Sequence, residues 1–294
     1  MEMTNLLSGS ELYPLSVVIA TLGGDTLAGT ICSLNQGAII PAEVLVCIPE
    51  SESSCVEDLL QSNIRIIKTP CRGQVAQRAY GLQSVSQDLV LQLDDDVVLQ
   101  PKALHILIQE LVRLGRGNAV APLFYHLSTG LCMTKYDQYA AGLLQSLSAF
   151  LICGAPWGIK RMGTVSLAGI GYGVDKNYCG LNPFETQWVP GGCVLCYKED
   201  LIIENYYPFA GKAYAEDLIH SILWKQKGVC LWVIPNASCA TSVASMPFSW
   251  LSMRQVLAPH VYATRLMGGE VWRLKLWHIL NVFKQFLLMA FRRT

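Results

Sequence analysis

Three consecutive carboxylates, Asp94, Asp95 and Asp96, directly follow an apolar run. Residues 88–93 have the pattern of a strand, and residues 97–99 are again apolar. Adjacent carboxylates between apolar flanks are unfavourable unless a cation neutralises them. Mg²⁺ and Mn²⁺ take oxygen ligands and commonly complete their shell with substrate phosphates. The triplet therefore indicates a metal-dependent enzyme for a diphosphate compound, with an acidic surface turn as the alternative.

A second acidic pair, Glu216-Asp217, begins an apolar stretch with helical spacing. Acidic residues stabilise the N-terminal end of a helix, and this is the structural alternative for the pair. The functional interpretation is a rigid carboxylate that takes a proton from an attacking hydroxyl group. Upstream, Gly191-Gly192 predicts a bend where the backbone can come close to a substrate.

The composition describes an apolar chain with balanced charge. Of the 294 residues, 52% are hydrophobic and 15% are charged, and 22 Lys and Arg balance 22 Asp and Glu. A soluble domain is usually about one quarter charged. Balanced charge provides no field for nucleic acid, so we expect no nucleic-acid partner. The apolar excess favours contact with a membrane or with another partner.

The 11 cysteines are irregularly spaced and odd in number. Together with an N-terminus that lacks a signal-peptide pattern, they favour a reducing, cytoplasmic compartment. Cys193 and Cys196 form a single CxxC, but a zinc site needs further ligands. Residues three apart on a strand also face opposite sides of the sheet. We therefore interpret the pair as small buried hydrophobic residues.

Strands and helices are predicted to alternate over the first part of the chain. The predicted strands are 15–20, 43–48, 64–67 and 89–93, and the predicted helices lie around 27–34, 58–60 and 73–85. Such alternation predicts βαβ units and a parallel sheet, and hence an α/β fold. We predict a nucleotide-binding half over residues 14–120, preceded by a loose lead-in over residues 1–13.

With these motifs in this order, the chain resembles the family 2 glycosyltransferases, which have the GT-A fold. The resemblance spans residues 15–265. It rests on Ser16-Val17-Val18-Ile19-Ala20-Thr21, the block from Arg72-Gly73-Gln74 to Arg78, the acidic triplet, Gly191-Gly192 and Glu216-Asp217. It implies a nucleotide-diphospho-sugar transferase with a mostly parallel central sheet. Such an enzyme moves a sugar, with inversion, from its donor to an acceptor hydroxyl.

The resemblance also implies a role for each motif. Asp94 is expected near the nucleoside, Asp96 on a Mn²⁺ or Mg²⁺ ion that bridges the diphosphate, and Asp95 in support of either. Asp217 is expected to be the general base, with Glu216 orienting the acceptor. The remaining residues expected at the nucleotide-sugar are Thr21, Glu50, Arg78, Gly191 and Gly192. For Arg78, contact with the diphosphate and a surface salt bridge are both open.

The chain departs from the family pattern at three places. Pro49-Glu50 stands where the family often has an Asp pair for the nucleobase or ribose, so Glu50 is the candidate substitute. Residues 235–241 lack the metal-binding His that relatives often carry, so His260 is the candidate metal ligand. A structural His260 is the alternative. Of the basic pair that usually follows the Gly-Gly strand, only Lys198 is present.

Two apolar segments extend the predicted domain plan. Residues 142–159 carry no charge and predict an interfacial or buried helix, within an apolar insertion near 142–174 of an acceptor half over 121–265. Residues 271–294 contain no Asp or Glu but five Lys and Arg. On a helical wheel one face collects Trp272, Leu276, Ile279, Leu280, Phe283, Phe286 and Leu287. We predict a basic, amphipathic, membrane-associating helix over 266–294, with packing on the domain or a dimer contact as alternatives.

These observations predict an enzyme of cell-surface polysaccharide or glycolipid assembly on the cytoplasmic face of a membrane. Its donor is a nucleotide-diphospho-sugar, its acceptor a glycan or lipid-linked hydroxyl, and the group moved a hexose or deoxyhexose. One alternative is a non-catalytic membrane scaffold that keeps the fold. Another is a sugar nucleotidyltransferase, which needs a Gly-rich loop with Arg and Lys after the first strand. Residues 22–29 contain neither basic residue.

Overall fold

The computed structural model describes residues 12–56, 59, 61–133, 143–209, 212–242 and 250–291, without the side chains of 143–145, 178, 250–254 and 285–291. Several sequence-based predictions fall outside these residues. They are most of the lead-in over 1–13, most of the short helix at 58–60, the side chains of Phe286 and Leu287, and Arg292 and Arg293.

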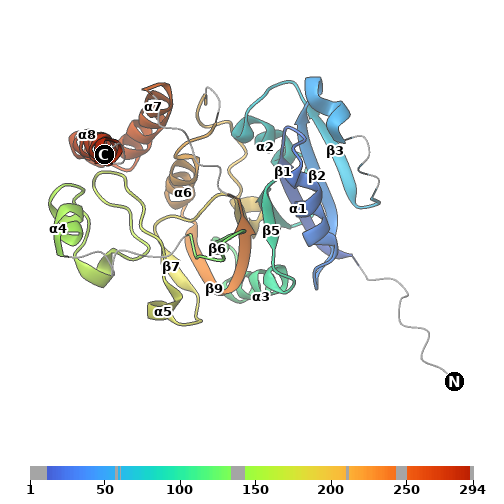
Figure 1. The fold of residues 1–294 in the computed structure, drawn as a ribbon. Coiled ribbons are helices and arrows are strands. Elements are labelled where there is room, and N and C mark those ends of the chain that lie inside the picture. Colours follow the sequence, from blue (N-terminus) through green and yellow to red (C-terminus); the bar gives the residue numbers. More distant parts are fainter. Residues whose placement is uncertain are drawn as a thin grey trace.

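Nine strands of the described residues form one sheet, in the order β3-β2-β1-β4-β8-β6-β9-β5, with β7 paired to β9 (Figure 1). The strands are β1 Tyr13–Ala20, β2 Pro41–Pro49, β3 Ile64–Thr69, β4 Leu89–Asp94, β5 Val97–Leu99, β6 Asn118–His126, β7 Phe184–Thr186, β8 Cys193–Tyr197 and β9 Cys230–Thr241. Strands β1 to β4, β6 and β9 run in one direction, and β5, β7 and β8 run in the other. The sheet is therefore mixed, with most strands parallel in direction, as predicted.

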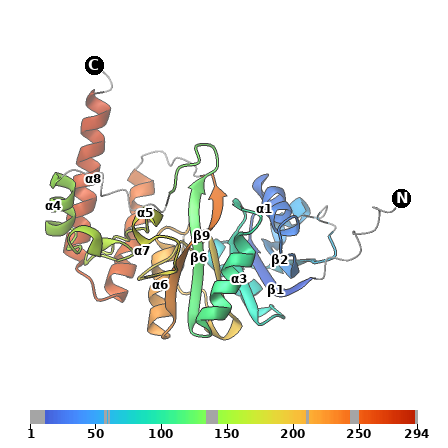
Figure 2. The ribbon, with the colours of Figure 1, turned by 90° about the horizontal axis from the view of Figure 1, so that it is seen from below.

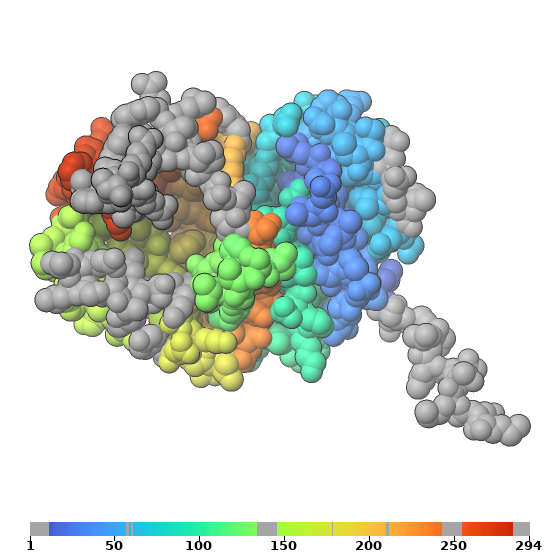
Figure 3. Space-filling view, viewed as in Figure 1, coloured from blue at the N-terminus to red at the C-terminus, as the bar shows by residue number. Residues whose placement is uncertain are grey.

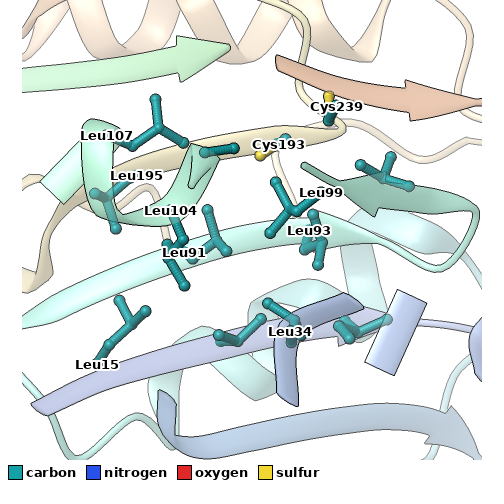
Figure 4. Close-up of a cluster of buried hydrophobic side chains, with 14 of the residues drawn as sticks. Leu15, Leu34, Leu91, Leu93, Leu99, Leu104, Leu107, Cys193, Leu195 and Cys239 are labelled. Atoms are coloured by element: carbon teal, nitrogen blue, oxygen red, sulfur yellow. The ribbon is translucent and has the colours of Figure 1, made fainter. Parts of the chain in front are cut away.

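Helices cover both faces of this sheet. They are α1 Thr26–Asn35, α2 Gln74–Gln83, α3 Ala103–Leu114, α4 Leu143–Leu151, α5 Lys176–Cys179, α6 Glu216–Gln226, α7 Trp250–Leu266 and α8 Val271–Phe291, with short 3₁₀ turns η1 Glu50–Val56, η3 Gly158–Arg161 and η4 Lys198–Asp200. On one face, α1 and α3 pack on the strands through Leu34, Leu104 and Leu107 (Figure 4). On the other face, Leu82 of α2 and Trp224 of α6 belong to a second core.

The central strands are buried on both faces, which explains their continuous apolar sequences. In β1, Val17 and Ile19 lie in the first core, whereas Val18 lies in the second. The two cysteines of β8 divide in the same way: Cys193 joins the first core and Cys196 the second. The prediction that these two cysteines face opposite sides of the strand is therefore confirmed.

The ends of three neighbouring strands meet at one edge of the sheet. Ala20 at the end of β1 is in register with Cys47 of β2 and with Asp94 of β4. The antiparallel strand β8 begins at the same edge, where the carbonyl of Gly192 accepts a hydrogen bond of 2.8 Å from the Asp94 amide. The acidic triplet and the Gly-Gly bend, about a hundred residues apart in the chain, are therefore neighbours.

Helices α4, α7 and α8 lie at the end of the molecule opposite β3, and both views place α4 beside α8 (Figures 1 and 2). Leu274 of α8 is fully buried in a small core with Cys153 and Ala168. Within the described part of the chain, none of the helices combines the length and the apolar character needed to cross a membrane.

Candidate active site

Two adjoining cavities lie at the edge of the sheet where β1 and β4 end. The first, of about 690 Å³, is lined by Thr21, Arg72, Gln74, Gln77, Asp94, Asp95, Asp96 and Lys212, among others. The second, of about 460 Å³, is lined by Phe124, Met133, Trp188, Gly192, Tyr214, Glu216 and Asp217, among others. Both share Asp94, Asp96 and Lys212. In Figure 3 the blue to teal first part of the chain faces the later segments across a furrow.

The acidic triplet is held by polar side chains from β1 and α2. Thr21 donates its hydroxyl to Asp95, and Gln74 donates a hydrogen bond of 2.7 Å to Oδ1 of Asp94. Arg78 reaches the same oxygen at 2.8 Å. Burial nevertheless raises the pKa of Asp94 to about 6, against the effect of Arg78, and the negative charges of Glu216 and Asp96 raise it further. The site therefore carries more negative charge than Arg78 balances.

Arg78 lies beneath the cavities. Its side chain is 2% exposed, and it forms ion pairs with Asp94 and with Glu216. These neighbouring carboxylates raise the pKa of Arg78 further, against the effect of burial. The surface salt bridge considered above is therefore wrong. The guanidinium is engaged by two carboxylates and lines neither cavity in the described part of the chain, so its contact with a diphosphate stays a prediction.

Glu216, at the start of α6, is enclosed by hydrogen-bond donors. Besides Arg78, the Tyr206 hydroxyl donates to Glu216 Oε1 at 3.1 Å, and Nδ1 of His220 lies 3.7 Å from the same oxygen. His220 in turn stacks on Trp224, with ring centroids 3.9 Å apart. Burial opposes ionisation, but the Arg78 guanidinium holds the pKa of Glu216 well below its usual range. Glu216 is therefore a fixed negative charge.

Asp217 follows Glu216 but has the opposite electrostatic character. Burial, and next the charge of Glu216, raise the pKa of Asp217 well above its ordinary value. Ala215, which precedes the Glu216-Asp217 pair, has a left-handed backbone with φ of +57°, which is unusual for a residue with a side chain. A carboxylate with a raised pKa at the wall of a cavity is suited to accept a proton.

The Gly-Gly bend lies directly against these carboxylates. A Cβ atom on Gly191 would lie 2.8 Å from Oδ1 of Asp217 and 2.9 Å from Oε2 of Glu216. On Gly192 it would lie 2.9 Å from Oδ2 of Asp94. The carbonyl of Gly191 is held by Nε2 of Gln92 at 2.8 Å. The close approach predicted at the bend is therefore, in this structure, an approach to the acidic side chains.

The carboxylates of the triplet fit a divalent cation that is also bound by the phosphates of a substrate. Among the described residues, no group of three or more His, Cys, Asp and Glu side chains is arranged to hold a metal. Asp94 and Asp96, however, both line the two cavities. Mg²⁺ is commonly held by one or two carboxylates plus substrate phosphates. The donor set and its excess negative charge fit that mode.

Two predicted site residues are not brought to the cavities. Glu50 is exposed at the first residue of η1 and is not among the described residues that line either cavity. His260 lies on α7, where its Nε2 is 2.8 Å from the carbonyl of Gly169. A carbonyl only accepts, so this nitrogen carries the proton and has no lone pair for a metal. His260 lines neither cavity among the described residues, so this structure packs it against Gly169 and does not bring it to Asp96.

Several functional side chains were missed by the sequence analysis. Gln77 donates to the carbonyls of Thr21 and Cys47 at 2.7 and 2.9 Å, and so fixes the ends of β1 and β2. Gln92 supports the bend, and its position inside an otherwise apolar strand was a readable signal. Lys212, just before the acidic pair, lines both cavities. Its basic charge next to an acidic motif was the available signal.

A mixed sheet that gathers carboxylates at the ends of its strands, beside two adjoining cavities, agrees with the predicted GT-A fold. Residues 16–161 match the family model for glycosyl transferase family 2. Over these 146 of the 294 residues, the chain is similar to the family 2 glycosyltransferases. The match includes the triplet and Arg78 but ends before the Gly-Gly bend and the Glu216-Asp217 pair. No curated protein matches the sequence.

One solved structure supports the fold assignment. The crystal structure of GalNAc-T7 with UDP, GalNAc and Mn²⁺ is similar, with a TM-score of 0.56 and 16% identity over 84% of this chain. This chain spans about half, 48%, of that one. The crystal structure of S. aureus TarS 1-349 has a TM-score of 0.49 and 15% identity, covering 85% of this chain and 64% of that one. At such identities the first likeness establishes the shared fold alone.

Proposed function

We propose that the protein is an inverting glycosyltransferase that moves a sugar from a nucleotide-diphosphate donor to an acceptor hydroxyl. One observation carries the proposal. Asp94 and Asp96 stand between two adjoining cavities, and Asp217, with its raised pKa, lies on the wall of the second. A donor in the first cavity and an acceptor in the second would meet at these carboxylates.

The first cavity is suited to the donor. Its wall combines the hydroxyl of Thr21 and the carboxylates of the triplet with two cationic side chains, Arg72 and Lys212. The cations complement a diphosphate. Asp96, with Asp94, would hold Mn²⁺ or Mg²⁺, which when bound neutralises charge on the diphosphate leaving group. In our proposal Asp94 and Asp95 remain the groups nearest the nucleoside.

The second cavity is suited to the acceptor. Asp217 takes the proton from the acceptor hydroxyl, while the oxygen of that hydroxyl forms a bond to the anomeric carbon of the sugar. The bond from that carbon to the diphosphate oxygen breaks, and the nucleotide leaves with the electron pair. Base and leaving group lie on opposite sides of the sugar, so this single displacement inverts the anomeric centre. Glu216 stays charged because Arg78 pairs with it, and it orients the acceptor.

We further propose a role in cell-surface polysaccharide or glycolipid assembly, with a hexosyl or deoxyhexosyl group passed to a glycan or lipid-linked acceptor. The apolar character of the chain supports this role, as do the exposed apolar side chains on α4 and α8. The corresponding location is the cytoplasmic face of a membrane, with the protein bound peripherally.

The proposed donor site is tested by calorimetric binding of UDP, dTDP and GDP, each with and without Mn²⁺. We expect one nucleotide to bind in a metal-dependent manner, and Asp96→Ala to abolish that dependence. Glu204→Ala is the matched control, because Glu204 is an exposed carboxylate outside both cavities. Binding of none of the nucleotides by folded protein would instead favour the non-catalytic scaffold.

The proposed base is tested with Asp217→Asn. The variant should bind the nucleotide like the wild type but lose transfer, because the amide accepts no proton. NMR of the product, compared with the donor, reports whether the anomeric configuration inverts. Transfer at the wild-type rate by Asp217→Asn would overturn the assignment of the base, and retention of configuration would overturn the single displacement.

A further inference from the structure

The outer face of α8 is apolar. Trp272, Ile279 and Phe283 are 57%, 65% and 61% exposed, and Leu276 and Leu280 are exposed as well. The helix packs on the rest of the molecule through a different set of residues, with Leu274 fully buried and Trp277 partly buried. The packing of α8 on the domain therefore does not cover the apolar face that the helical wheel predicted, as far as the described residues show that face.

The end of α4 and the loop after it extend this apolar face. Phe150 and Leu151 are about half exposed, as is Trp157, whose ring meets Phe150 edge to face at 5.8 Å. Arg273 joins the two elements, because Nη1 donates to the carbonyl of Leu151 at 2.6 Å. The same guanidinium lies 4.6 Å from the centre of the Trp272 ring. We call the exposed apolar side chains of residues 147–159 and 272–283 the α4–α8 surface.

The charged residues within the two segments of this surface are all basic. Residues 138–174 and 271–294 contain no Asp or Glu. Lys160, Lys275 and Lys284 are exposed next to the apolar side chains. The nearby acidic residue Glu270 is paired with Arg273 at 2.7 Å. Tryptophan and aliphatic side chains with flanking lysines match the boundary between the acyl chains and the anionic headgroups of a bilayer.

We propose that the α4–α8 surface binds the surface of an anionic phospholipid bilayer. A second copy of the chain is a poorer occupant, because a twofold contact through this surface would bring lysines together with no acidic residue of the two segments to pair with them. The proposal deepens the membrane location given in the proposed function, and it is independent of the transfer activity. Binding to lipid requires neither a nucleotide nor an acceptor, so each proposal can fail without the other.

The experiment is flotation of the full-length protein with phosphatidylcholine vesicles, with and without added phosphatidylglycerol. We expect the wild type to float with the anionic vesicles. Ile279→Glu combined with Phe283→Glu should lower the bound fraction at least about tenfold. In the wild type, both apolar side chains are expected to move from water into the bilayer surface, and the variant loses that burial. Leu151→Glu should lower the bound fraction as well, because α4 is part of the same surface. Lys275→Glu combined with Lys284→Glu should remove the preference for anionic vesicles.

Val112→Glu is the matched control. Val112 is 57% exposed on α3, away from α4 and α8 (Figure 1), so its variant should float like the wild type. Circular dichroism confirms that each variant is folded. The proposal is overturned if the wild type floats with neither vesicle, or if the α8 or the α4 variant floats unchanged. It is also overturned if light scattering shows that the wild type is a dimer and that the α8 variant is a monomer, because a second copy then covers the surface.

Discussion

Arg78 of α2 and Glu216 of α6 form a buried ion pair, although 138 residues separate them in the chain. The second terminal nitrogen of Arg78 holds Asp94 at 2.8 Å. One side chain therefore connects the end of the strand that carries the acidic triplet with the start of the helix that carries Asp217. The relative position of the proposed donor and acceptor sites depends on this contact.

The first prediction concerns the loss of this contact. Arg78→Gln leaves Glu216 buried without its cation, and removal of one partner of a buried pair costs about 3–5 kcal/mol. We expect a decrease of that order in the free energy of unfolding, measured by urea denaturation, and a lower transfer rate. Arg113→Gln is the control, because Arg113 pairs with Glu110 at the surface and its side chain is 60% exposed. It should change stability by less than about 1 kcal/mol.

The second prediction concerns the Gly-Gly bend. Gly191→Ala places a Cβ 2.8 Å from Oδ1 of Asp217, so the carboxylate has to move. Displacement of a catalytic group by about 1 Å can cost roughly a hundredfold in rate. We expect a loss of kcat of that order in a transfer assay, with the protein still folded. Gly29→Ala is the control, because a Cβ there meets nothing within 4 Å. It should leave kcat unchanged and stabilise α1 slightly.

Equal rates for Gly191→Ala and the wild type would mean that the position of Asp217 does not limit transfer. The comparison with Gly192→Ala separates the two carboxylates. Its Cβ meets Asp94 at 2.9 Å, so that variant should weaken metal-dependent nucleotide binding more than it weakens kcat.

Strands β1, β2 and β4 could be predicted from the sequence because they are buried on both faces. Their continuous apolar runs are the direct consequence of that burial, and the triplet follows the last of them. The Glu216-Asp217 pair was also placed correctly, since acidic residues mark the start of a helix. The apolar runs and the acidic helix start each involve residues that are neighbours in the chain, so they can be recognised from the sequence alone.

What could not be predicted depends on contacts between distant segments. The insertion of β8 between β4 and β6 brings Gly191 and Gly192 to the carboxylates, but no local pattern encodes that pairing. The burial of Arg78 goes with its ion pairs to Asp94 and Glu216, which are distant in the chain, rather than with its own sequence neighbours. Glu50 and His260 were assigned by their order in the chain, and chain order does not determine which way a turn or helix directs a side chain.

The third prediction is a pH dependence that follows from the raised pKa of Asp217. A general base works only when deprotonated, so kcat/KM should rise with pH through a value above that of an ordinary carboxyl, about 3.9. Stability should change in the opposite sense. Between the unfolded value and the raised folded value, the native state binds the proton more readily, so the free energy of unfolding falls as pH rises.

Asp217→Asn removes this titration, so the variant should gain stability relative to the wild type as pH rises through that window. Glu216→Gln should behave in the opposite way. The pKa of Glu216 is held low by Arg78, so its ionisation stabilises the native state above the unfolded value, about 4.3. Its variant should therefore be less stable than the wild type at neutral pH. Urea denaturation of both variants at several pH values tests these two expectations. If the stability relative to the wild type changed with pH in the same direction for both variants, the expectations would be contradicted.

The fourth prediction separates packing from metal binding at His260. Its Nε2 donates to the carbonyl of Gly169 at 2.8 Å, and its ring lies 6.4 Å from that of Trp277 and 5.6 Å from that of His278. His260→Ala leaves a carbonyl without its donor and opens space between α7 and α8. We expect the free energy of unfolding to fall by about 1–3 kcal/mol. Metal-dependent nucleotide binding, measured by calorimetry on the folded variant, should be unchanged.

Asp96→Ala is the counterpart of this variant and should give the opposite pattern. The Asp96 side chain lines both cavities and is partly exposed, so its loss should affect stability little but remove the dependence of nucleotide binding on Mn²⁺. If His260→Ala abolished that dependence while leaving stability unchanged, His260 would be a metal ligand after all. Helix α7 would then have to move toward the triplet when the donor binds, because in this structure His260 is held by Gly169.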